Sequence, residues 1–147
     1  LENRTLSNEK VISVETNYKA SVQENLVINL NQVKRNIKKK EFCLVDARGE
    51  KRFKGLVEEP RKNLKKGNVK GSKNLPFLKI INPENNTFKK KEEIEKIFLN
   101  HDINLNEKLA FSCGSGITAC VLGLASTVIN NKFPVIYDGS WAEYGLK

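Results

Sequence analysis

The residues best suited to chemistry lie between positions 111 and 118, which read FSCGSGIT. Cys113 stands in a glycine-rich turn between an apolar strand-like run and an apolar helix-like run. A thiol at this place lies beside the unpaired backbone N–H groups of a helix start, which favour the thiolate and lower the pKa of a cysteine. Gly114 and Gly116 allow a tight turn that directs several N–H groups inward, as in an anion-binding nest. We therefore expect nucleophilic chemistry with Cys113 as the attacking group.

The other two cysteines, Cys43 and Cys120, lie inside apolar runs, and we interpret both as core residues. Cys120 becomes a resolving thiol only if the loop moves. The three cysteines form no CxxC pair and no zinc-type spacing with His101, so we expect no metal site and no cofactor. His101 is predicted to be solvent-exposed and not catalytic. An odd cysteine count argues for a reducing compartment, such as the cytoplasm or the mitochondrial matrix.

The chain of 147 residues carries 26 lysines and arginines against 17 acidic residues, a net charge of +9. The lysines occur in short runs, such as 38–40 and 89–91, without interleaved aromatic residues. We interpret these runs as solvated surface with a general attraction for anionic substrates, and expect no nucleic-acid partner. No apolar run approaches the roughly 20 residues that a membrane helix needs, so no membrane partner is expected.

Short apolar runs alternate with helical patterns along the chain. Strands are predicted at 42–45, 74–77, 109–112 and 134–138, and helices at 22–40, 91–99 and 118–129. This alternation predicts an α/β fold with a central parallel sheet flanked by helices on both faces. Residues 1–20 are polar and are interpreted as a linker or N-terminal segment, and residues 21–147 as one domain. Ligands bind beyond the carboxyl ends of such strands, where Arg48, Cys113 and Asp138 fall.

Four segments in order resemble the 3-mercaptopyruvate sulfurtransferases of the rhodanese superfamily. The loop Cys113–Thr118 is similar to their active loop, and LVDAR at 44–48, followed by Arg52 and Arg61, is similar to their substrate-binding segment. Residues 67–77 and 137–143 resemble the following strand and the final strand with its turn. The resemblance covers about residues 22–147 and implies a rhodanese-like fold. Asn68 and Lys70 depart from the family pattern.

The resemblance implies that this chain is the C-terminal catalytic domain of a two-domain protein, and so a fragment. An N-terminal rhodanese-like domain of the same protein is then expected to form one wall of the cleft. The implied reaction moves a sulfane sulfur from 3-mercaptopyruvate to a thiol or cyanide through a persulfide on Cys113. Thioredoxin-type thiols are the implied acceptors.

By the same resemblance, Arg52 and Arg61 bind the substrate carboxylate. Arginine suits this role because it presents paired N–H donors, and three arginines cluster here in a chain that otherwise uses lysine. For Arg48 the alternative is to brace the loop against Asp46 or Glu59.

The remaining loop residues have more than one interpretation. Ser115 is either a hydrogen-bond donor to the substrate carbonyl or leaving enolate, or a small turn residue. Thr118 is expected to direct its hydroxyl at the loop or the sulfur, with helix capping as the alternative. Gly114, Gly116 and Ile117 complete the active-site loop. Asp138 and Trp141 are expected to fix the last strand and its turn.

The same residues bear on three alternative activities. A thiosulfate:cyanide sulfurtransferase favours a cationic loop, whereas positions 114 and 115 are glycine and serine. A cysteine phosphatase needs Cys-x5-Arg, and the sixth residue after Cys113 is Ala119, which excludes it. A non-enzymatic persulfide carrier remains open.

Overall fold

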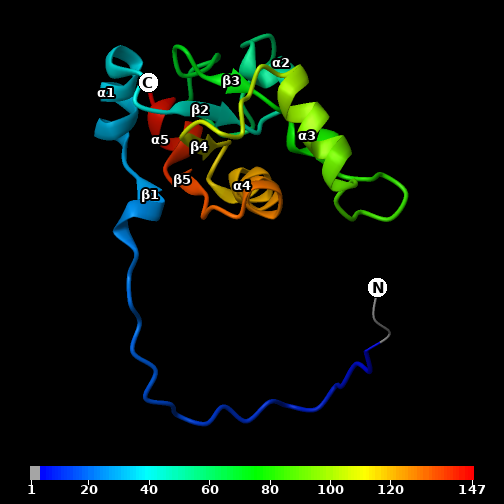
Figure 1. The fold of residues 1–147 in the computed structure, drawn as a ribbon. Helices are drawn as coiled ribbons and strands as arrows, with labels where there is room; N and C mark the ends of the chain where they lie inside the picture. The colour runs from blue at the N-terminus through cyan, green and yellow to red at the C-terminus, as the bar shows by residue number, and fades with distance from the viewer. Residues whose placement is uncertain (1–3) are drawn as a thin grey trace.

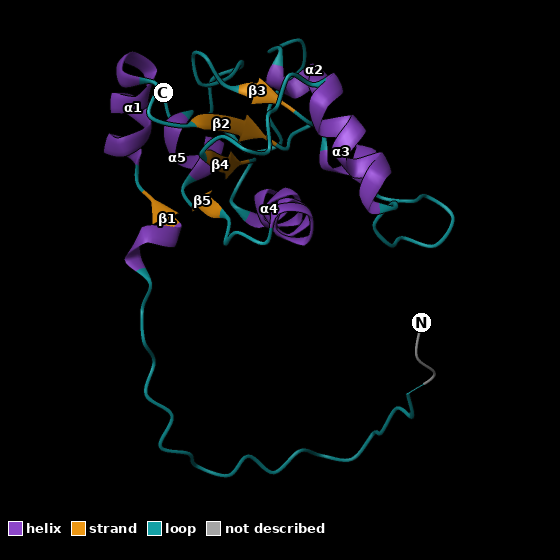
Figure 2. Ribbon diagram, viewed as in Figure 1, coloured by secondary structure: helices purple, strands orange, loops and turns teal. Residues whose placement is uncertain are grey.

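The computed structural model describes residues 4–147 and centres on a five-stranded parallel sheet (Figures 1 and 2). The strand order is β1-β5-β4-β2-β3. The strands are β1 (Val27–Ile28), β2 (Cys43–Asp46), β3 (Lys73–Asn74), β4 (Leu109–Ser112) and β5 (Val135–Tyr137). All four residues of β4 are buried, as expected for the middle of a sheet that is covered on both faces. The predicted α/β fold with a central parallel sheet is confirmed.

Helices cover both faces of the sheet. They are α1 (Leu30–Lys39), α2 (Glu50–Phe53), α3 (Lys91–Asn100), α4 (Ile117–Asn130) and α5 (Ser140–Tyr144), with single 3-10 turns η1 (Glu24–Leu26) and η2 (Phe77–Ile80). One core cluster joins Phe98 of α3 and Leu122 of α4 to Phe111 of β4. The other joins Val33 of α1 and Trp141 of α5 on the opposite face. The two clusters pack against opposite faces of the sheet, and each contains residues of both β2 and β4.

The helix predicted at 22–40 is wrong in its first half. A capping box begins α1 at Leu30: the side chain of Asn29 accepts a hydrogen bond from the Gln32 N–H at 3.1 Å, and Gln32 accepts from the Asn29 N–H at 2.8 Å. A cap residue has extended backbone, so the residues before it are free to pair in a sheet. Val27 and Ile28 form β1 beside β5 instead of continuing the helical pattern.

The other elements agree with the sequence to within a few residues, with one exception. The strand expected at 74–77 ends at Asn74, because Pro76 turns the chain into η2. Two short helices, α2 and α5, were not predicted. Five or fewer residues cannot show a helical period, so a sequence pattern does not reveal them.

Residues 4–23 form no helix or strand, and their side chains are exposed (Figure 1). They include most of the predicted segment 1–20, whose first three residues lie outside the described part of the chain. The division into a linker and a domain stays a prediction. Within residues 4–147, no helix combines the length and the apolar character needed to cross a membrane.

Candidate active site

Cys113 follows β4 directly and precedes α4, at the carboxyl edge of the sheet. The residue is only 2% exposed. Burial raises the pKa of its thiol, but hydrogen bonds from the Thr118 hydroxyl and from the backbone N–H groups of Ser115, Ala119 and Thr118 lower it by more. The pKa of Cys113 therefore lies below the ordinary cysteine value. The Ser115 N–H lies 3.4 Å from the Cys113 Sγ atom.

Gly116 makes the turn into α4. Its φ of +84° lies in the left-handed region, where a side chain is strained. A Cβ atom there would also lie 3.0 Å from the carbonyl oxygen and from the carboxylate of Asp138. The loop therefore depends on glycine at this position for two independent reasons.

Ser140, the first residue of α5, ties the cysteine loop to the last strand. Its fully buried Oγ atom accepts hydrogen bonds from the backbone N–H groups of Cys113 and Gly116, both at 3.0 Å. The same hydroxyl donates to the carbonyl oxygen of Tyr137 at 2.8 Å. Sequence reasoning missed Ser140, because a serine in a glycine-flanked turn carries no signal of such contacts. Ser140 fixes two of the amides that shape the loop.

A pocket of about 300 Å³ opens above the cysteine. Its lining comes from two segments: Arg52, Glu59, Pro60, Arg61 and Leu64 from the loop after β2, and Cys113, Gly114, Ser115, Ile117 and Thr118 from the loop after β4. The structure thus brings every predicted site residue except Gly116 into the lining of one pocket. The pocket holds one thiol with a lowered pKa and two guanidinium groups.

Arg48 is a buried brace and does not line the pocket. Its guanidinium binds Asp46 at 2.7 Å and Glu59 at 2.8 Å, and donates to the carbonyl oxygen of Gly67 at 2.8 Å. It also stacks over the Trp141 ring, 4.3 Å from the ring centroid. Of the two interpretations, the bracing of the loop against Asp46 and Glu59 is the one observed.

Arg52 and Arg61 both lie on the pocket wall, but Arg52 is held by an ion pair and Arg61 only by a long hydrogen bond. Arg52 binds Glu59 at 2.6 Å, and its side chain remains 31% exposed. A Cβ atom at position 114 would lie 3.1 Å from the Arg52 Nη2 atom, so glycine there leaves room for this guanidinium. Arg61 is exposed and donates only a long hydrogen bond, 3.4 Å, to the carbonyl oxygen of Gly114. Both cations are accessible to an anion in the pocket.

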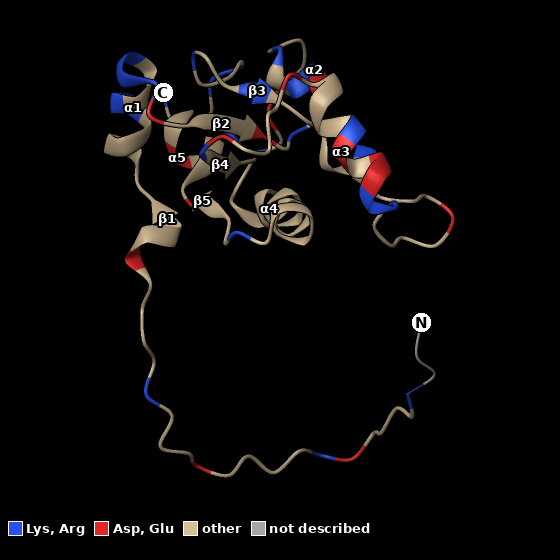
Figure 3. Cartoon of the chain, in the orientation of Figure 1, with Lys and Arg blue, Asp and Glu red and all other residues tan. Residues whose placement is uncertain are grey.

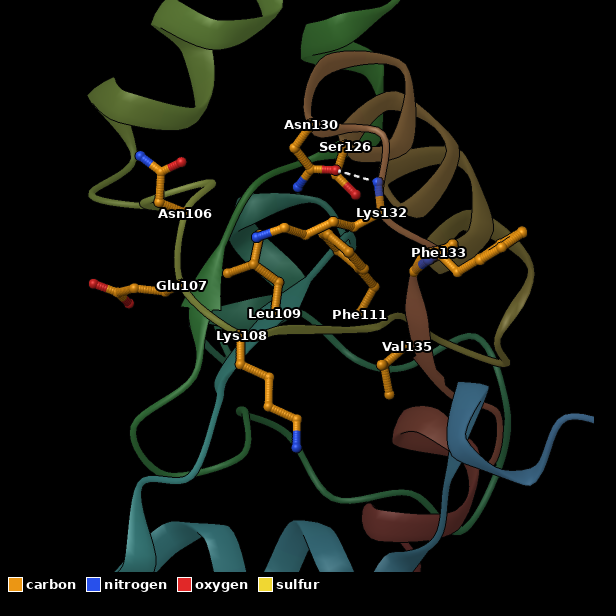
Figure 4. Close-up of a pocket in the computed structure, with 11 residues that line it drawn as sticks. Asn106, Glu107, Lys108, Leu109, Phe111, Ser126, Asn130, Lys132, Phe133 and Val135 are labelled. Carbon is orange, nitrogen blue, oxygen red and sulfur yellow. Dashed lines mark hydrogen bonds between the residues drawn. The ribbon is translucent and has the colours of Figure 1, made fainter.

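A second pocket, of about 330 Å³, lies at the amino end of the sheet (Figure 4). Lys108 and Leu109 at the start of β4 and Lys132 after α4 line it. Its only polar interaction drawn is local, the Lys132 N–H donating to Asn130. This pocket contains no cysteine, and we place the chemistry in the pocket above Cys113.

Two sequence interpretations outside the site are wrong. Cys120 is exposed, and its Sγ donates to the Gly116 carbonyl oxygen at 3.4 Å. Because α4 is apolar around much of its circumference, the apolar run did not show which side faces water. His101 is half-buried, and its Nδ1 lies 2.7 Å from the Asn74 carbonyl oxygen. Cys43 is half-buried, and burial raises the pKa of its thiol.

Within residues 4–147, His101, the cysteines and the acidic residues form no group of three or more that could hold a metal ion. The groups that line the pocket include the Cys113 thiol, the guanidinium groups of Arg52 and Arg61, and the hydroxyls of Ser115 and Thr118. This arrangement suits attack by a thiolate on an electrophilic sulfur of a small anion.

Comparisons with known proteins agree with this geometry. A family model described as "Rhodanese-like domain" matches residues 29–147. The Arabidopsis thaliana protein named thiosulfate/3-mercaptopyruvate sulfurtransferase 2 is 39% identical over 127 residues, covering 86% of this chain and 37% of its own length. Human 3-mercaptopyruvate sulfurtransferase is 31% identical over 146 residues, covering 99% of this chain and 49% of its own length.

The fold comparison points the same way. The crystal structure of SseA from Escherichia coli, described as a 3-mercaptopyruvate sulfurtransferase of "rhodanese" fold, superposes with a TM-score of 0.70 at 27% identity, over 84% of this chain and 44% of that one. The chain thus spans about half or less of the length of these relatives. The family-model match includes β2, β3, β4, β5 and the loop that carries Cys113, and the chain belongs to the rhodanese-like domain family.

Proposed function

We propose that this chain is the catalytic domain of a sulfurtransferase that takes sulfane sulfur from 3-mercaptopyruvate onto Cys113. The observation that carries the proposal is a thiol of lowered pKa on the floor of a pocket whose wall presents Arg52 and Arg61. The relatives' names support both the reaction class and the donor.

The first half-reaction forms the persulfide. The Cys113 thiolate attacks the donor sulfur, a sulfur–sulfur bond forms, and the bond between that sulfur and its carbon breaks. The electron pair stays on the carbon side as the enolate of pyruvate, which then takes up a proton, while the donor's thiol proton stays on the outer sulfur. In this proposal Arg52 and Arg61 hold the donor carboxylate. Ser115, which lines the same pocket, donates a hydrogen bond to the developing enolate.

The second half-reaction returns the enzyme to its starting state. An acceptor thiolate, or cyanide, attacks the outer sulfur, the bond to Cys113 breaks, and the Cys113 thiolate is released. Hydrogen bonds from Thr118 and the loop amides stabilise this leaving thiolate in the same way that they lower its pKa. No cofactor enters either step.

Thiosulfate is the second candidate donor, because the Arabidopsis relative's name includes both substrates. The neutral Gly114 and Ser115 place no cation against a dianion at the loop itself, which supports mercaptopyruvate. Comparing kcat/KM for the two donors decides between them: a clear preference for thiosulfate contradicts our assignment.

Three finer points belong to the same proposal. The acceptor is a thiol, the working compartment is reducing, and an N-terminal rhodanese-like domain of the same protein forms the outer wall of the pocket. The alignment lengths support the proposed N-terminal domain, because the chain matches less than half of the length of each of these relatives. If catalysis requires that outer wall, the alternative is that this domain alone carries a persulfide without catalysing turnover.

Mass spectrometry of the intact chain tests the proposal directly. After incubation with 3-mercaptopyruvate we expect a mass gain of one sulfur atom that a reductant reverses. Cys113→Ser abolishes the gain, whereas Cys43→Ser and Cys120→Ser, matched changes at the other two thiols, retain it. An unchanged wild-type mass, or an adduct that survives Cys113→Ser, contradicts the mechanism.

A further inference from the structure

Most of the net positive charge of the chain falls in the segment that supplies one wall of the pocket. Residues 48–73 carry ten lysines and arginines against three glutamates, so +7 of the net +9 falls in this segment. Figure 3 shows blue stretches of ribbon, which mark Lys and Arg, at α2 and around β3. The buried Arg48 and the partly exposed Arg52 are paired with Asp46 and Glu59. The remaining cations of the segment therefore dominate its surface.

Four exposed cations adjoin the pocket lining, and we name them the basic rim: Lys51, Arg61, Lys62 and Lys65. Lys51 precedes Arg52, Lys62 follows Arg61, and Lys65 follows Leu64. Arg52, Arg61 and Leu64 line the pocket. Within residues 4–147, no carboxylate forms an ion pair with any of these four. The exposed glutamates of the segment are already paired, Glu50 with Lys54 at 2.6 Å and Glu58 with Lys66 at 2.5 Å. The basic rim thus carries uncompensated charge.

Exposed apolar side chains accompany this charge. Ile117, on the opposite lip of the pocket, is 75% exposed, and Leu56 in the charged segment is 69% exposed. The one aromatic residue of the segment, Phe53, is half-buried and unavailable for stacking on bases. Charge with aliphatic contact suits a protein surface better than a nucleic acid.

The position of Cys113 adds a requirement on the acceptor. Its sulfur is buried and is reached through the pocket, so an acceptor must carry its thiol on a segment that enters. The residues around that thiol then contact the basic rim. Carboxylates at those positions are attracted to the rim and raise the association rate.

We infer that the basic rim docks a protein acceptor whose reactive cysteine is surrounded by acidic side chains. This inference rests on the proposed function for the reaction, while the docking itself is a separate property of the surface. It assigns a role to Lys51, Lys62 and Lys65, which the donor chemistry does not use.

A single-turnover experiment tests the inference. Cys113 is loaded with sulfur from 3-mercaptopyruvate and freed of excess donor, so only the transfer step is observed. The acceptors are dithiothreitol and two peptides of equal length with one cysteine, flanked either by aspartate and glutamate or by lysine. We expect faster transfer to the acidic peptide, with an advantage that shrinks as salt is added.

Charge reversal on the rim gives the sharper comparison. In Lys62→Glu/Lys65→Glu the rate to the acidic peptide falls by about tenfold, while the rate to dithiothreitol is unchanged. The matched control is Lys108→Glu/Lys132→Glu, which has the same net charge but alters the pocket at the amino end of the sheet (Figure 4). This control retains the wild-type preference. Circular dichroism and sulfur loading confirm that both variants fold.

The outcomes separate the two claims. Equal losses in both double variants, or no preference between the peptides, overturn the inference and leave the persulfide mechanism standing. Failure of sulfur loading contradicts the proposed function, and binding of an acidic peptide with serine in place of cysteine then tests docking alone. Rim-dependent binding of a single-stranded oligonucleotide, without a peptide preference, overturns the inference in favour of nucleic acid.

Discussion

Glu59 binds Arg52 through a contact of 2.6 Å between its Oε2 atom and the arginine Nη2 atom, while its Oε1 atom binds Arg48 at 2.8 Å. One carboxylate, only 2% exposed, therefore joins an arginine of the pocket wall to a fully buried brace. The orientation of Arg52 in the pocket wall therefore depends on a carboxylate that also binds the buried Arg48.

Glu59→Gln keeps the size of the side chain and removes its charge. We expect the free energy of unfolding to fall by about 3 kcal/mol, because two arginines lose a buried partner. The KM for mercaptopyruvate should rise as Arg52 loses its orientation. Chemical denaturation and steady-state kinetics measure the two effects. The control is Glu58→Gln, an exposed neighbour whose loss should cost less than about 1 kcal/mol; equal costs at 58 and 59 speak against the role of Glu59.

Arg61→Lys tests the carboxylate grip. Lysine keeps the charge but loses the paired donors, so the KM for mercaptopyruvate should rise by about tenfold with a smaller change in kcat. Arg35→Lys makes the same change on α1, where Arg35 binds Glu41 at 3.2 Å, and should leave both constants unaltered. A fall in kcat alone at position 61 is incompatible with a binding role.

Thr118→Val removes the hydroxyl that helps to lower the pKa of Cys113. The thiolate reacts and the thiol does not, so a higher pKa moves the rise of the alkylation rate to higher pH. At about pH 7 the rate of iodoacetamide labelling should therefore fall several-fold. Thr118→Ser retains the hydroxyl and should keep the wild-type pH profile. Identical pH profiles for Thr118→Val and Thr118→Ser would show that the Thr118 hydroxyl does not lower the pKa of Cys113.

Gly116→Ala introduces a side chain at a φ of +84° and against Asp138. We expect a loss of about 1–3 kcal/mol in the free energy of unfolding and slower sulfur loading of Cys113. Gly49→Ala is the control: its φ is −57° and a Cβ atom there meets nothing within 4 Å, so the cost should stay below about 1 kcal/mol. Thermal unfolding and mass spectrometry give the two readouts.

Ser140→Ala leaves the amides of Cys113 and Gly116 without their acceptor. Two unpaired buried N–H groups should cost about 3 kcal/mol, and labelling of Cys113 should slow. Ser126→Ala also removes a buried hydroxyl, but that hydroxyl only donates to the Gly123 carbonyl oxygen within α4, so about 1 kcal/mol is expected. Similar costs for the two variants exclude a special role for Ser140.

Strong local patterns allowed much of the fold to be predicted from the sequence. The apolar run at 109–112 is β4 as predicted, and the apolar run at 118–129 lies within α4. Parallel strands have their carboxyl ends at one edge of the sheet, so the segments that follow β2 and β4 were expected to lie close together. Arg52, Arg61 and Cys113 do line one pocket there. The sequence also offered the ion pairs of Arg48 with Asp46 and Glu59 as one of two interpretations of that residue.

The features that were missed depend on contacts between distant segments. Whether Val27 and Ile28 form a strand is decided by pairing with β5, over a hundred residues later, and not by their own pattern. Cys120 lies on a helix that is apolar almost throughout, so its exposure is set by tertiary packing. The hydrogen bonds of Ser140 to Cys113 and Gly116 span 27 and 24 residues, and no local pattern specifies them.

This separation has a consequence for the nascent protein. Translation proceeds from the N-terminus, so Cys113 leaves the ribosome before Ser140, whose hydroxyl accepts a hydrogen bond from the Cys113 N–H. Until β5 and α5 have docked, the turn lacks that anchor. Docking of the last strand and the last helix therefore completes the loop around Cys113, and it can take place only after Cys113 itself has been synthesised.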